Sequence, residues 1–231
     1  MNEVADRLEL VLAKIAETAE RAKRSTDEIR LVAVSKGHDA EKVRLALDAG
    51  QLVFGESKVQ EARAKIPLLA SHLSWHFIGH LQKNKVRHAL PLFELVHSVD
   101  SLDLAQQIQR VAKENGLYPR VLLEVNVAGE GAKFGFSPEG LSSAMEQVLS
   151  LDRLSIEGLM TIPPIAEEAE HSRRYFVSLR HLRDKLEKEF ALKLPELSMG
   201  MSDDFAIAVE EGSTLVRVGT AIFGPRERKT K

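Results

Sequence analysis

The first residue that could carry out chemistry is Lys36, which follows the apolar run 31–34 after a single serine. A lysine at the end of an apolar strand is partly removed from water, and this disfavours its ammonium form. The free amine is a nucleophile that attacks carbonyl carbon and forms a Schiff base. The position therefore predicts a carbonyl-binding lysine. The alternative is a side chain that only extends past the strand end into solvent.

A second candidate is Arg217, which lies between two valines in the run 214–218. Side chains alternate along a strand, so Arg217 faces the side opposite Val216 and Val218. If the valines pack against helices, Arg217 faces the mouth of the fold. A guanidinium is always charged and only donates, so a carboxylate, a phosphate or an aromatic nitrogen must accept from it. The alternative is a salt bridge to Glu56 or to an aspartate at a neighbouring strand end.

Two segments near the C-terminus have the composition of a phosphate site. Gly219 permits close approach and Thr220 adds a hydroxyl, while Ser202 lies in the segment 198–204 that leads into a predicted helix. The first amide groups of a helix are unsatisfied donors, and barrel enzymes often bind phosphate in the loops after strands seven and eight. The alternative is that Ser202 is an ordinary helix N-cap.

The residue pattern does not favour a metal site or a serine hydrolase. His72, His76 and His80 are four residues apart and would share a helix face, but 74–78 is predicted as a strand, which leaves His72 outside the group. No G-x-S-x-G motif accompanies the serines and histidines, so nothing favours a serine hydrolase. We predict no metal site.

These residues need elements that bring strand ends together. The chain alternates short β-rich runs with longer helical stretches, which is the pattern of parallel β-α-β units. We predict eight strands, at 31–34, 52–54, 75–78, 95–97, 121–127, 155–160, 196–199 and 214–218, with a helix after each but the last. Eight such units in 231 residues are typical of a closed (β/α)8 barrel of the TIM type, whose strand ends meet at one mouth.

One further helix precedes the first strand, because apolar residues recur at helical spacing from Val4 to Ala19. No linker or change of composition divides the chain, so we predict a single domain over residues 1–231. An open doubly wound sheet would place a glycine-rich fingerprint after its first strand. The nearest glycine run, Gly129 to Gly135, follows the fifth strand with a different spacing and is predicted to be a flexible loop.

Composition excludes several classes of protein. The 32 Lys and Arg residues against 34 Asp and Glu residues give a formal charge of −2, so no field that would collect nucleic acid or anionic lipid is expected. No apolar run reaches the length of a membrane helix, and the polar N-terminus does not resemble a secretory signal. The absence of cysteine excludes disulfides and fits a reducing compartment, so we expect a cytoplasmic protein.

Several segments together resemble one known family. They are Ala33-Val34-Ser35-Lys36, Phe54-Gly55-Glu56 and the runs 75–82, 158–163, 197–204 and 212–224. In combination they resemble the pyridoxal-phosphate homeostasis proteins, which are barrels similar to the N-terminal domain of bacterial alanine racemase. The resemblance covers nearly the whole chain.

The resemblance implies a role for each candidate residue. Lys36 would carry pyridoxal 5′-phosphate as an aldimine, Ser202, Gly219 and Thr220 would hold its phosphate, and Arg217 would face its pyridine nitrogen. These are the same strand-end groups that the residue pattern singles out.

The chain departs from the family pattern beside the second strand. Family members usually have an asparagine and an aromatic residue where this chain has Ser57 and Lys58. Ser57 is expected to lie next to the cofactor ring, but its side chain is shorter than an amide. We therefore expect a water molecule to fill part of that space.

The resemblance implies a cofactor-binding protein that takes part in intracellular homeostasis or delivery of pyridoxal phosphate, with apoenzymes as partners and little or no turnover. It is expected to be a monomer or a weak dimer. The first alternative is a weak amino-acid racemase, which needs an acid-base group on each face of the cofactor. In alanine racemases a tyrosine from an additional β-domain supplies the second group, and Tyr118 and Tyr175 are both predicted to lie far from the mouth. A second alternative is a Schiff-base aldolase, in which Lys36 would act on a sugar phosphate.

Overall fold

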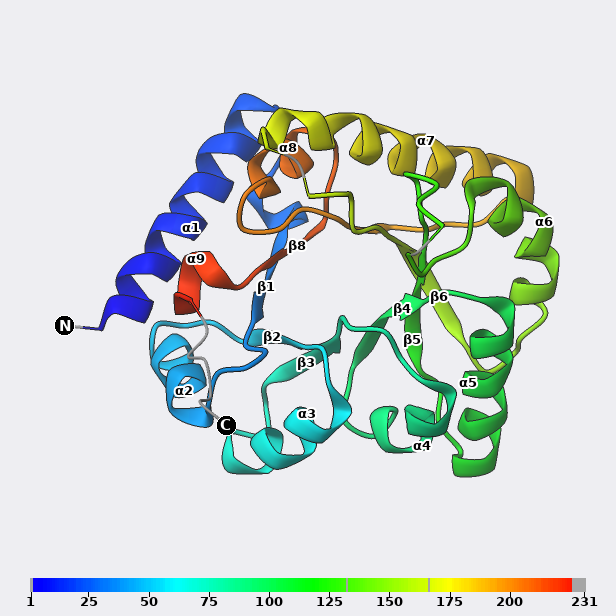
Figure 1. Ribbon diagram of the computed structural model, residues 1–231, viewed down its shortest axis with the longest axis horizontal. Coiled ribbons are helices and arrows are strands. Elements are labelled where there is room, and N and C mark those ends of the chain that lie inside the picture. The colour runs from blue at the N-terminus through cyan, green and yellow to red at the C-terminus, as the bar shows by residue number, and fades with distance from the viewer. Residues whose placement is uncertain (1, 132, 166, 226–231) are drawn as a thin grey trace.

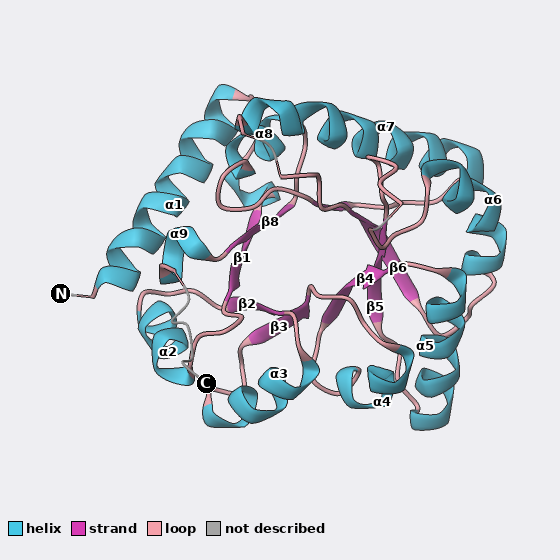
Figure 2. Ribbon diagram, viewed as in Figure 1, coloured by secondary structure: helices cyan, strands magenta, loops and turns pink. Residues whose placement is uncertain are grey.

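Eight parallel strands close into a barrel in the computed structural model, which describes residues 2–131, 133–165 and 167–225. Each strand pairs with the next along the chain, and the last pairs with the first. The strands are β1 (Arg30–Val34), β2 (Val53–Glu56), β3 (Ser74–Phe77), β4 (Leu95–Val99), β5 (Arg120–Glu124), β6 (Ser155–Met160), β7 (Glu196–Ser198) and β8 (Leu215–Val218). Helices surround them (Figures 1 and 2). The predicted (β/α)8 fold is confirmed.

The helices alternate with the strands along the chain. They are α1 (Glu3–Arg21), α2 (Ala40–Asp48), α3 (Val59–Lys65), α4 (Val86–Ala89), α5 (Leu102–Asn115), α6 (Pro138–Leu149), α7 (Arg173–Phe190), α8 (Phe205–Glu210) and α9 (Thr220–Phe223). The predicted N-terminal helix is α1, and the side chain of Asn2 caps it by accepting from the backbone N–H groups of Val4 and Ala5. Among the described residues, no helix combines the length and apolar character that crossing a membrane requires.

Most strand ends lie within two residues of the sequence prediction, and two differences are larger. The fifth strand ends at Glu124 instead of residue 127, because the following loop folds back over its end: the N–H of Phe136 donates to the carbonyl of Glu124, and the N–H of Asn126 donates to the carbonyl of Phe136. The expectation that no helix follows the last strand was wrong, since α9 begins directly after Gly219.

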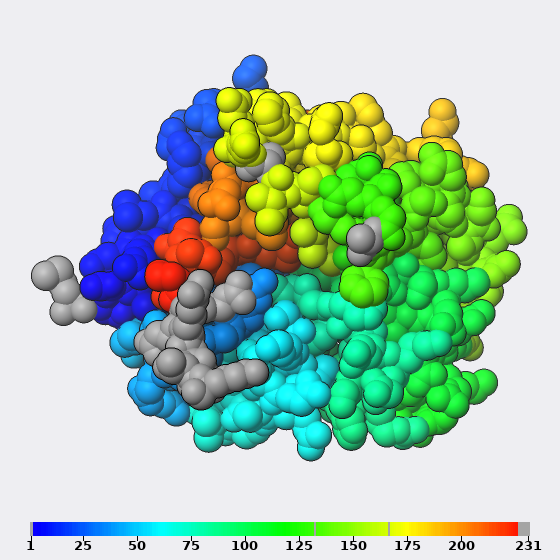
Figure 3. Space-filling view, in the orientation of Figure 1, coloured from blue at the N-terminus to red at the C-terminus, as the bar shows by residue number. Residues whose placement is uncertain are grey.

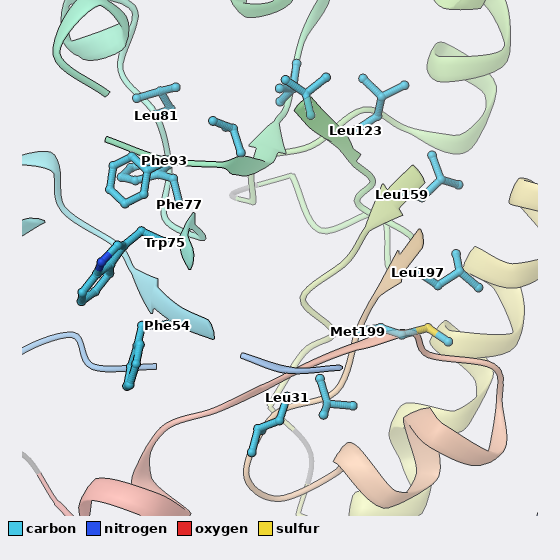
Figure 4. Packing of buried hydrophobic residues seen from close by; sticks show 14 of the residues in the cluster. Leu31, Phe54, Trp75, Phe77, Leu81, Phe93, Leu123, Leu159, Leu197 and Met199 are labelled. Atoms are coloured by element: carbon cyan, nitrogen blue, oxygen red, sulfur yellow. The ribbon is translucent and has the colours of Figure 1, made fainter. Parts of the chain in front are cut away.

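The buried apolar residues form two separate clusters. The larger one lies between the strands and the helices. Figure 4 shows members of this cluster around the outside of the strands, Phe54, Trp75 and Leu197 among them. The smaller one fills the inside of the barrel with Val32, Leu95, Leu122, Met160 and Leu215. Side chains on alternate strand positions therefore belong either to the outer layer or to the interior, which decides the residues that reach the mouth.

The two ends of the chain meet on one side of the barrel. Helix α1 packs against α8 and α9, and β1 is paired with β8. In the space-filling view the blue N-terminal helix lies directly beside the red C-terminal segment (Figure 3). The loops after β7 and β8 are thus held by elements from both ends of the sequence.

Candidate functional site at the barrel mouth

Lys36 follows the end of β1, at the mouth of the barrel. Val32 belongs to the interior cluster, so the alternation of side chains assigns Val34 to the inner face as well. Continued beyond the strand, the same alternation assigns Lys36 to the inner rim, and its side chain is partly buried. The structure thus gives the mouth an amine at the position that the sequence predicts.

A buried ion pair holds the backbone beneath Lys36. Nζ of Lys65, from α3, donates to the carbonyl of Ser35 at 2.8 Å and forms an ion pair with Oε1 of Glu56. The hydroxyl of Ser35 donates to the same carboxylate oxygen at 2.8 Å. Glu56 is fully buried, and among the described residues its other oxygen, Oε2, has no hydrogen-bond partner. The carboxylate and the ammonium therefore fix the residue that precedes the candidate lysine.

Arg217 faces the inside of the barrel, as predicted from the two valines beside it. Val216 and Val218 lie in the outer cluster, while Nη1 of Arg217 donates to Oγ of Ser198 at 2.6 Å and Nη2 donates to the carbonyl of Thr161 at 2.9 Å. Burial lowers the pKa of Arg217 to about 10, so its guanidinium stays charged at neutral pH.

The alternative of a salt bridge between Arg217 and Glu56 was wrong. A Cβ built on Gly55 would lie 3.0 Å from a methyl group of Val32, so Gly55 faces the interior, and the next residue, Glu56, faces the outer layer and Lys65. The two charged groups lie on opposite sides of the strands.

Polar residues that the sequence analysis did not assign continue inward from Arg217. Oγ of Ser198 lies 2.8 Å from Nδ1 of His97, and Nε2 of His97 lies 3.0 Å from Nδ1 of His76. A signal was present in the sequence, because His97 and Ser198 interrupt strands that are otherwise apolar. Their pairing depends on the register between distant strands, which the sequence did not give.

The candidate phosphate segments converge after β7 and β8. The backbone N–H groups of Gly219 and Ala221 donate to Oγ of Ser202 at 3.3 and 3.4 Å. The alternative that Ser202 is an N-cap was wrong, because α8 starts three residues later and its N-cap is Asp204, whose carboxylate accepts from the N–H of Met201. Thr220 is exposed beside this group.

Gly219 lies close to the end of β1, where there is little room for a side chain. A Cβ at this position would lie 3.2 Å from the carbonyl oxygen of Val34 and 3.3 Å from its Cβ. The backbone of β8 thus passes close to the inner rim of β1, two residues before Lys36. The amine and the N–H groups near Ser202 are therefore placed by paired neighbouring strands.

Ser57 lies after β2, at the edge of the mouth, and is partly buried. It lines a groove of about 280 Å³ together with Phe77, His80 and Lys85. The loop after β3 passes so close that a Cβ on Gly79 would lie 2.3 Å from the carbonyl oxygen of Ser57. The backbone at Ser57 is thus tightly placed, whereas its short side chain leaves open space beside it.

The three histidines with helical spacing do not form one site. His76 lies inside the barrel, whereas Nδ1 of His80 lies 2.9 Å from a carboxylate oxygen of Asp100, and its ring stacks on Phe134 with centroids 3.6 Å apart. His72 is exposed in the turn before β3. Within residues 2–131, 133–165 and 167–225, no group of three or more His, Cys, Asp or Glu side chains could hold a metal ion.

Glu124 is a buried acid at the end of β5. Burial and, to a smaller extent, the charge of Asp100 raise its pKa to about 7, while Arg217 acts in the opposite direction. Near neutral pH this side chain therefore exchanges a proton in the mouth of the barrel. The sequence analysis did not single it out, because one glutamate after an apolar run has no distinguishing spacing.

We expect Glu124→Gln to raise the free energy of unfolding of the ligand-free protein at about pH 8 and to change it little at about pH 4. A carboxyl whose pKa is higher in the folded state weakens folding as the pH rises from about 4.5 through about 7. Urea unfolding across this pH range measures the difference. Glu9→Gln, at an exposed position on α1, is the control. A difference that does not grow with pH would contradict the assignment.

The mouth thus contains three kinds of groups that suit one sort of ligand. Lys36 can react with a carbonyl, Arg217 offers a permanent cation, and the hydroxyl of Ser202, which accepts from the N–H groups of Gly219 and Ala221, can donate its own proton to an anion. Such a donor set fits a molecule with an aldehyde, an acceptor nitrogen and a phosphate.

Comparisons with known proteins match this chain to one family. The family model described as the alanine racemase N-terminal domain matches residues 10–227. The pyridoxal phosphate homeostasis protein of Aquifex aeolicus is 45% identical over 96% of this chain and 98% of its own length. The protein of the same name from Pseudomonas aeruginosa is 44% identical over 98% of this chain and 97% of its own length.

Solved structures give the same result for the fold. PipY of Synechococcus elongatus, solved with PLP bound, is 38% identical, with a TM-score of 0.83 over 96% of this chain and all of its own. An alanine racemase from Clostridium difficile is 20% identical and has a TM-score of 0.75. The matched region spans 97% of this chain but 58% of that racemase. At this low identity the likeness concerns the barrel fold alone.

Proposed function

The chain belongs to the pyridoxal phosphate homeostasis proteins within the alanine racemase N-terminal-domain family, and on this basis we propose that it binds pyridoxal 5′-phosphate through a Schiff base on Lys36. It holds the cofactor and releases it to apoenzymes that need it, and it does so with little or no turnover of its own. It acts as a monomer or a weak dimer.

One observation carries this proposal: an amine, a buried guanidinium and convergent N–H groups meet at the end of two paired strands. Lys36 follows β1, while Arg217 and Gly219 belong to β8 and its end. Each group matches one part of pyridoxal phosphate, namely the aldehyde, the ring nitrogen and the phosphate. Ser57 is proposed to lie beside the ring, where its short side chain leaves room for water.

Pyridoxal phosphate supplies an aldehyde for Schiff-base formation and a ring that withdraws electrons. Gly219, Thr220 and Ser202 bind its phosphate with backbone and hydroxyl donors. Arg217 donates to the ring nitrogen and, because it stays charged, keeps that nitrogen from taking up a proton. A ring nitrogen without a proton withdraws electrons less strongly, so the site suits retention of the cofactor more than carbanion chemistry.

Amino-acid turnover is expected to be absent or far below about 1 per second for racemisation, transamination and decarboxylation. The racemase alternative needs a second acid-base group above the cofactor. Tyr118 precedes β5, at the end of the strand opposite the mouth, and the hydroxyl of Tyr175 in the outer helix α7 accepts from Arg174. Chiral chromatography after incubation with common amino acids measures racemisation. Turnover in the ordinary enzyme range would overturn this part of the proposal.

An absorbance spectrum of the purified protein tests the central proposal. We expect a visible Schiff-base band that borohydride removes, followed by a mass shift on the one peptide that contains Lys36. Reduction that labels another lysine would contradict the assignment. A protein that stays colourless after incubation with pyridoxal phosphate would exclude cofactor binding and would favour the aldolase alternative.

Thr220→Glu is expected to weaken binding of pyridoxal phosphate at least about tenfold, which corresponds to about 1.4 kcal/mol. Thr220 adjoins the N–H groups that converge on Ser202, so a longer anionic side chain competes with the phosphate by bulk and by charge. Fluorescence titration measures the dissociation constant. Thr220→Gln has nearly the same size without the charge and separates the two effects. Unchanged affinity in both variants would place the phosphate elsewhere.

A further inference from the structure

A continuous line of buried polar groups runs through the barrel beneath the mouth. The carbonyl of Thr161 accepts from Arg217 at 2.9 Å, and Arg217 donates to the hydroxyl of Ser198 at 2.6 Å. The hydroxyl of Ser198 lies 2.8 Å from His97, which lies 3.0 Å from His76. None of the five residues is more than 4% exposed, so water does not separate them.

These side chains come from strands that are far apart in sequence. Ser198 ends β7, Arg217 lies in β8, and His97 and His76 lie in β4 and β3. Apolar side chains, among them Leu95, fill the interior around them. Polar groups in such a place destabilise the fold unless they are hydrogen-bonded to one another. The line is therefore a built network and not a set of separate contacts.

Hydrogen-bond chemistry gives the line a direction. Arg217 can only donate, so the hydroxyl oxygen of Ser198 accepts from it. Among the described residues, the other hydrogen-bond partner of this hydroxyl is Nδ1 of His97, which therefore accepts the hydroxyl proton. His97 then carries its own proton on Nε2 and donates to Nδ1 of His76. His76 in turn must carry its proton on Nε2. Both histidines are thereby assigned to one tautomer.

Burial, with a smaller contribution from nearby charges, keeps both histidines neutral. Burial lowers the pKa of His76 to about 4, with Arg30 and Arg120 acting in the same direction and Glu94 opposing them. Burial also lowers the pKa of His97 well below its usual range, with His76, Arg217 and Arg30 acting in the same direction. Arg217, which donates to Ser198, keeps its charge near neutral pH, because Glu124 and Asp204 partly offset the effect of burial on its pKa. The direction of the line is therefore stable near neutral pH.

We propose that Ser198, His97 and His76 are positioning residues, which hold the guanidinium of Arg217 in one orientation so that it can donate to the cofactor's ring nitrogen. This inference rests on the proposed function for its consequence but not for its geometry. Ser198 fixes Nη1, the carbonyl of Thr161 fixes Nη2, and the two histidines fix the proton of Ser198. Without Ser198 the guanidinium loses one of its two anchors, and Nδ1 of His97 loses its donor.

The first test uses the cofactor-free protein and nuclear magnetic resonance of the histidine ring nitrogens. We expect Nε2–H tautomers for both His97 and His76, unchanged between about pH 6 and about pH 8. A proton on Nδ1 of His97, or a charged ring in this range, would overturn the proposed direction. This result is independent of cofactor binding.

The second test replaces Ser198 and follows the cofactor. Ser198→Ala is expected to keep bound pyridoxal phosphate, with affinity within about tenfold of the wild type, because Lys36 and the phosphate contacts remain. Its visible spectrum is expected to titrate with a midpoint shifted by at least about one pH unit, since the ring nitrogen can now take up a proton. Ser198→Thr keeps the hydroxyl and should restore the wild-type titration.

Ser213→Ala is the matched control. The hydroxyl of Ser213 is fully buried and donates to the carbonyl of Met199 at 2.8 Å, outside the line. The Ser213→Ala variant also loses one buried serine hydroxyl, and its visible spectrum should titrate with the wild-type midpoint. Should Ser198→Ala fail to fold, His97→Gln takes its place, because it breaks the same line one residue further on.

The outcomes separate the two proposals. If the wild type takes up no pyridoxal phosphate, the proposed function fails, and the resonance experiment still decides the direction of the line. If the cofactor binds but the spectrum of Ser198→Ala titrates with the same midpoint as the wild type and Ser213→Ala, the positioning role is wrong. The proposed function then stands.

Discussion

Lys36→Arg is expected to abolish the visible Schiff-base absorbance and to weaken retention of pyridoxal phosphate by about 100-fold or more. Arginine keeps the positive charge and much of the length of lysine, but it has no amine that can lose a proton and attack an aldehyde. Only the phosphate contacts and Arg217 would then hold the cofactor. Absorbance after gel filtration, followed by mass analysis after borohydride, measures the loss.

Lys58→Arg is the matched control, because Lys58 lies at the edge of the mouth but is exposed and forms an ion pair with Glu61 on the surface. It should keep the band at full intensity. A Lys36→Arg protein that stays coloured, or a Lys58→Arg protein that loses its colour, would show that another lysine carries the cofactor.

Lys65→Met is expected to lower the free energy of unfolding by about 3–5 kcal/mol, the usual cost of leaving one partner of a buried ion pair alone. Glu56 is fully buried and forms an ion pair with Lys65. Without Lys65 its carboxylate would keep only the hydroxyl of Ser35 as a hydrogen-bond partner. Urea unfolding of the cofactor-free protein measures the loss of stability.

The double variant Lys65→Met with Glu56→Gln tests the cause of that loss. It leaves no unpaired charge in the outer layer, so it should recover a large part of the stability. Lys58→Met removes a lysine from an exposed pair and should cost no more than about 1 kcal/mol. If Lys65→Met is as mild as Lys58→Met, the buried pair does not hold the strand end beneath Lys36.

The alternation of side chains explains how much of the site could be predicted from the sequence. Val216 and Val218 mark the face of the last strand that packs against the helices. The alternation of side chains therefore correctly predicted that Arg217 faces the inside of the barrel. The same rule applied to Gly55 would have turned Glu56 outward, away from Arg217. The prediction for Arg217 succeeds because it needs only the period of one strand.

The acceptors of Arg217 could not be predicted in this way. Ser198 and Thr161 follow from the register between β6, β7 and β8, and His97 reaches Ser198 from the far side of the barrel. The N-cap of α8 could not be predicted for the same reason. Ser202 and Asp204 are both good capping residues, and only the geometry of the loop decides between them. Pairings that cross the barrel depend on the closed structure.

The closure of the barrel by its two ends affects how the protein is made. Strand β1 is synthesised early, but its partner β8 and the N–H groups of Gly219 and Ala221 come near the end of translation. Until they leave the ribosome, β1 has an unpaired edge, and α1 has neither α8 nor α9 to pack against. A nascent chain, or one cut short before residue 215, can therefore carry Lys36 and yet have no complete place for a cofactor.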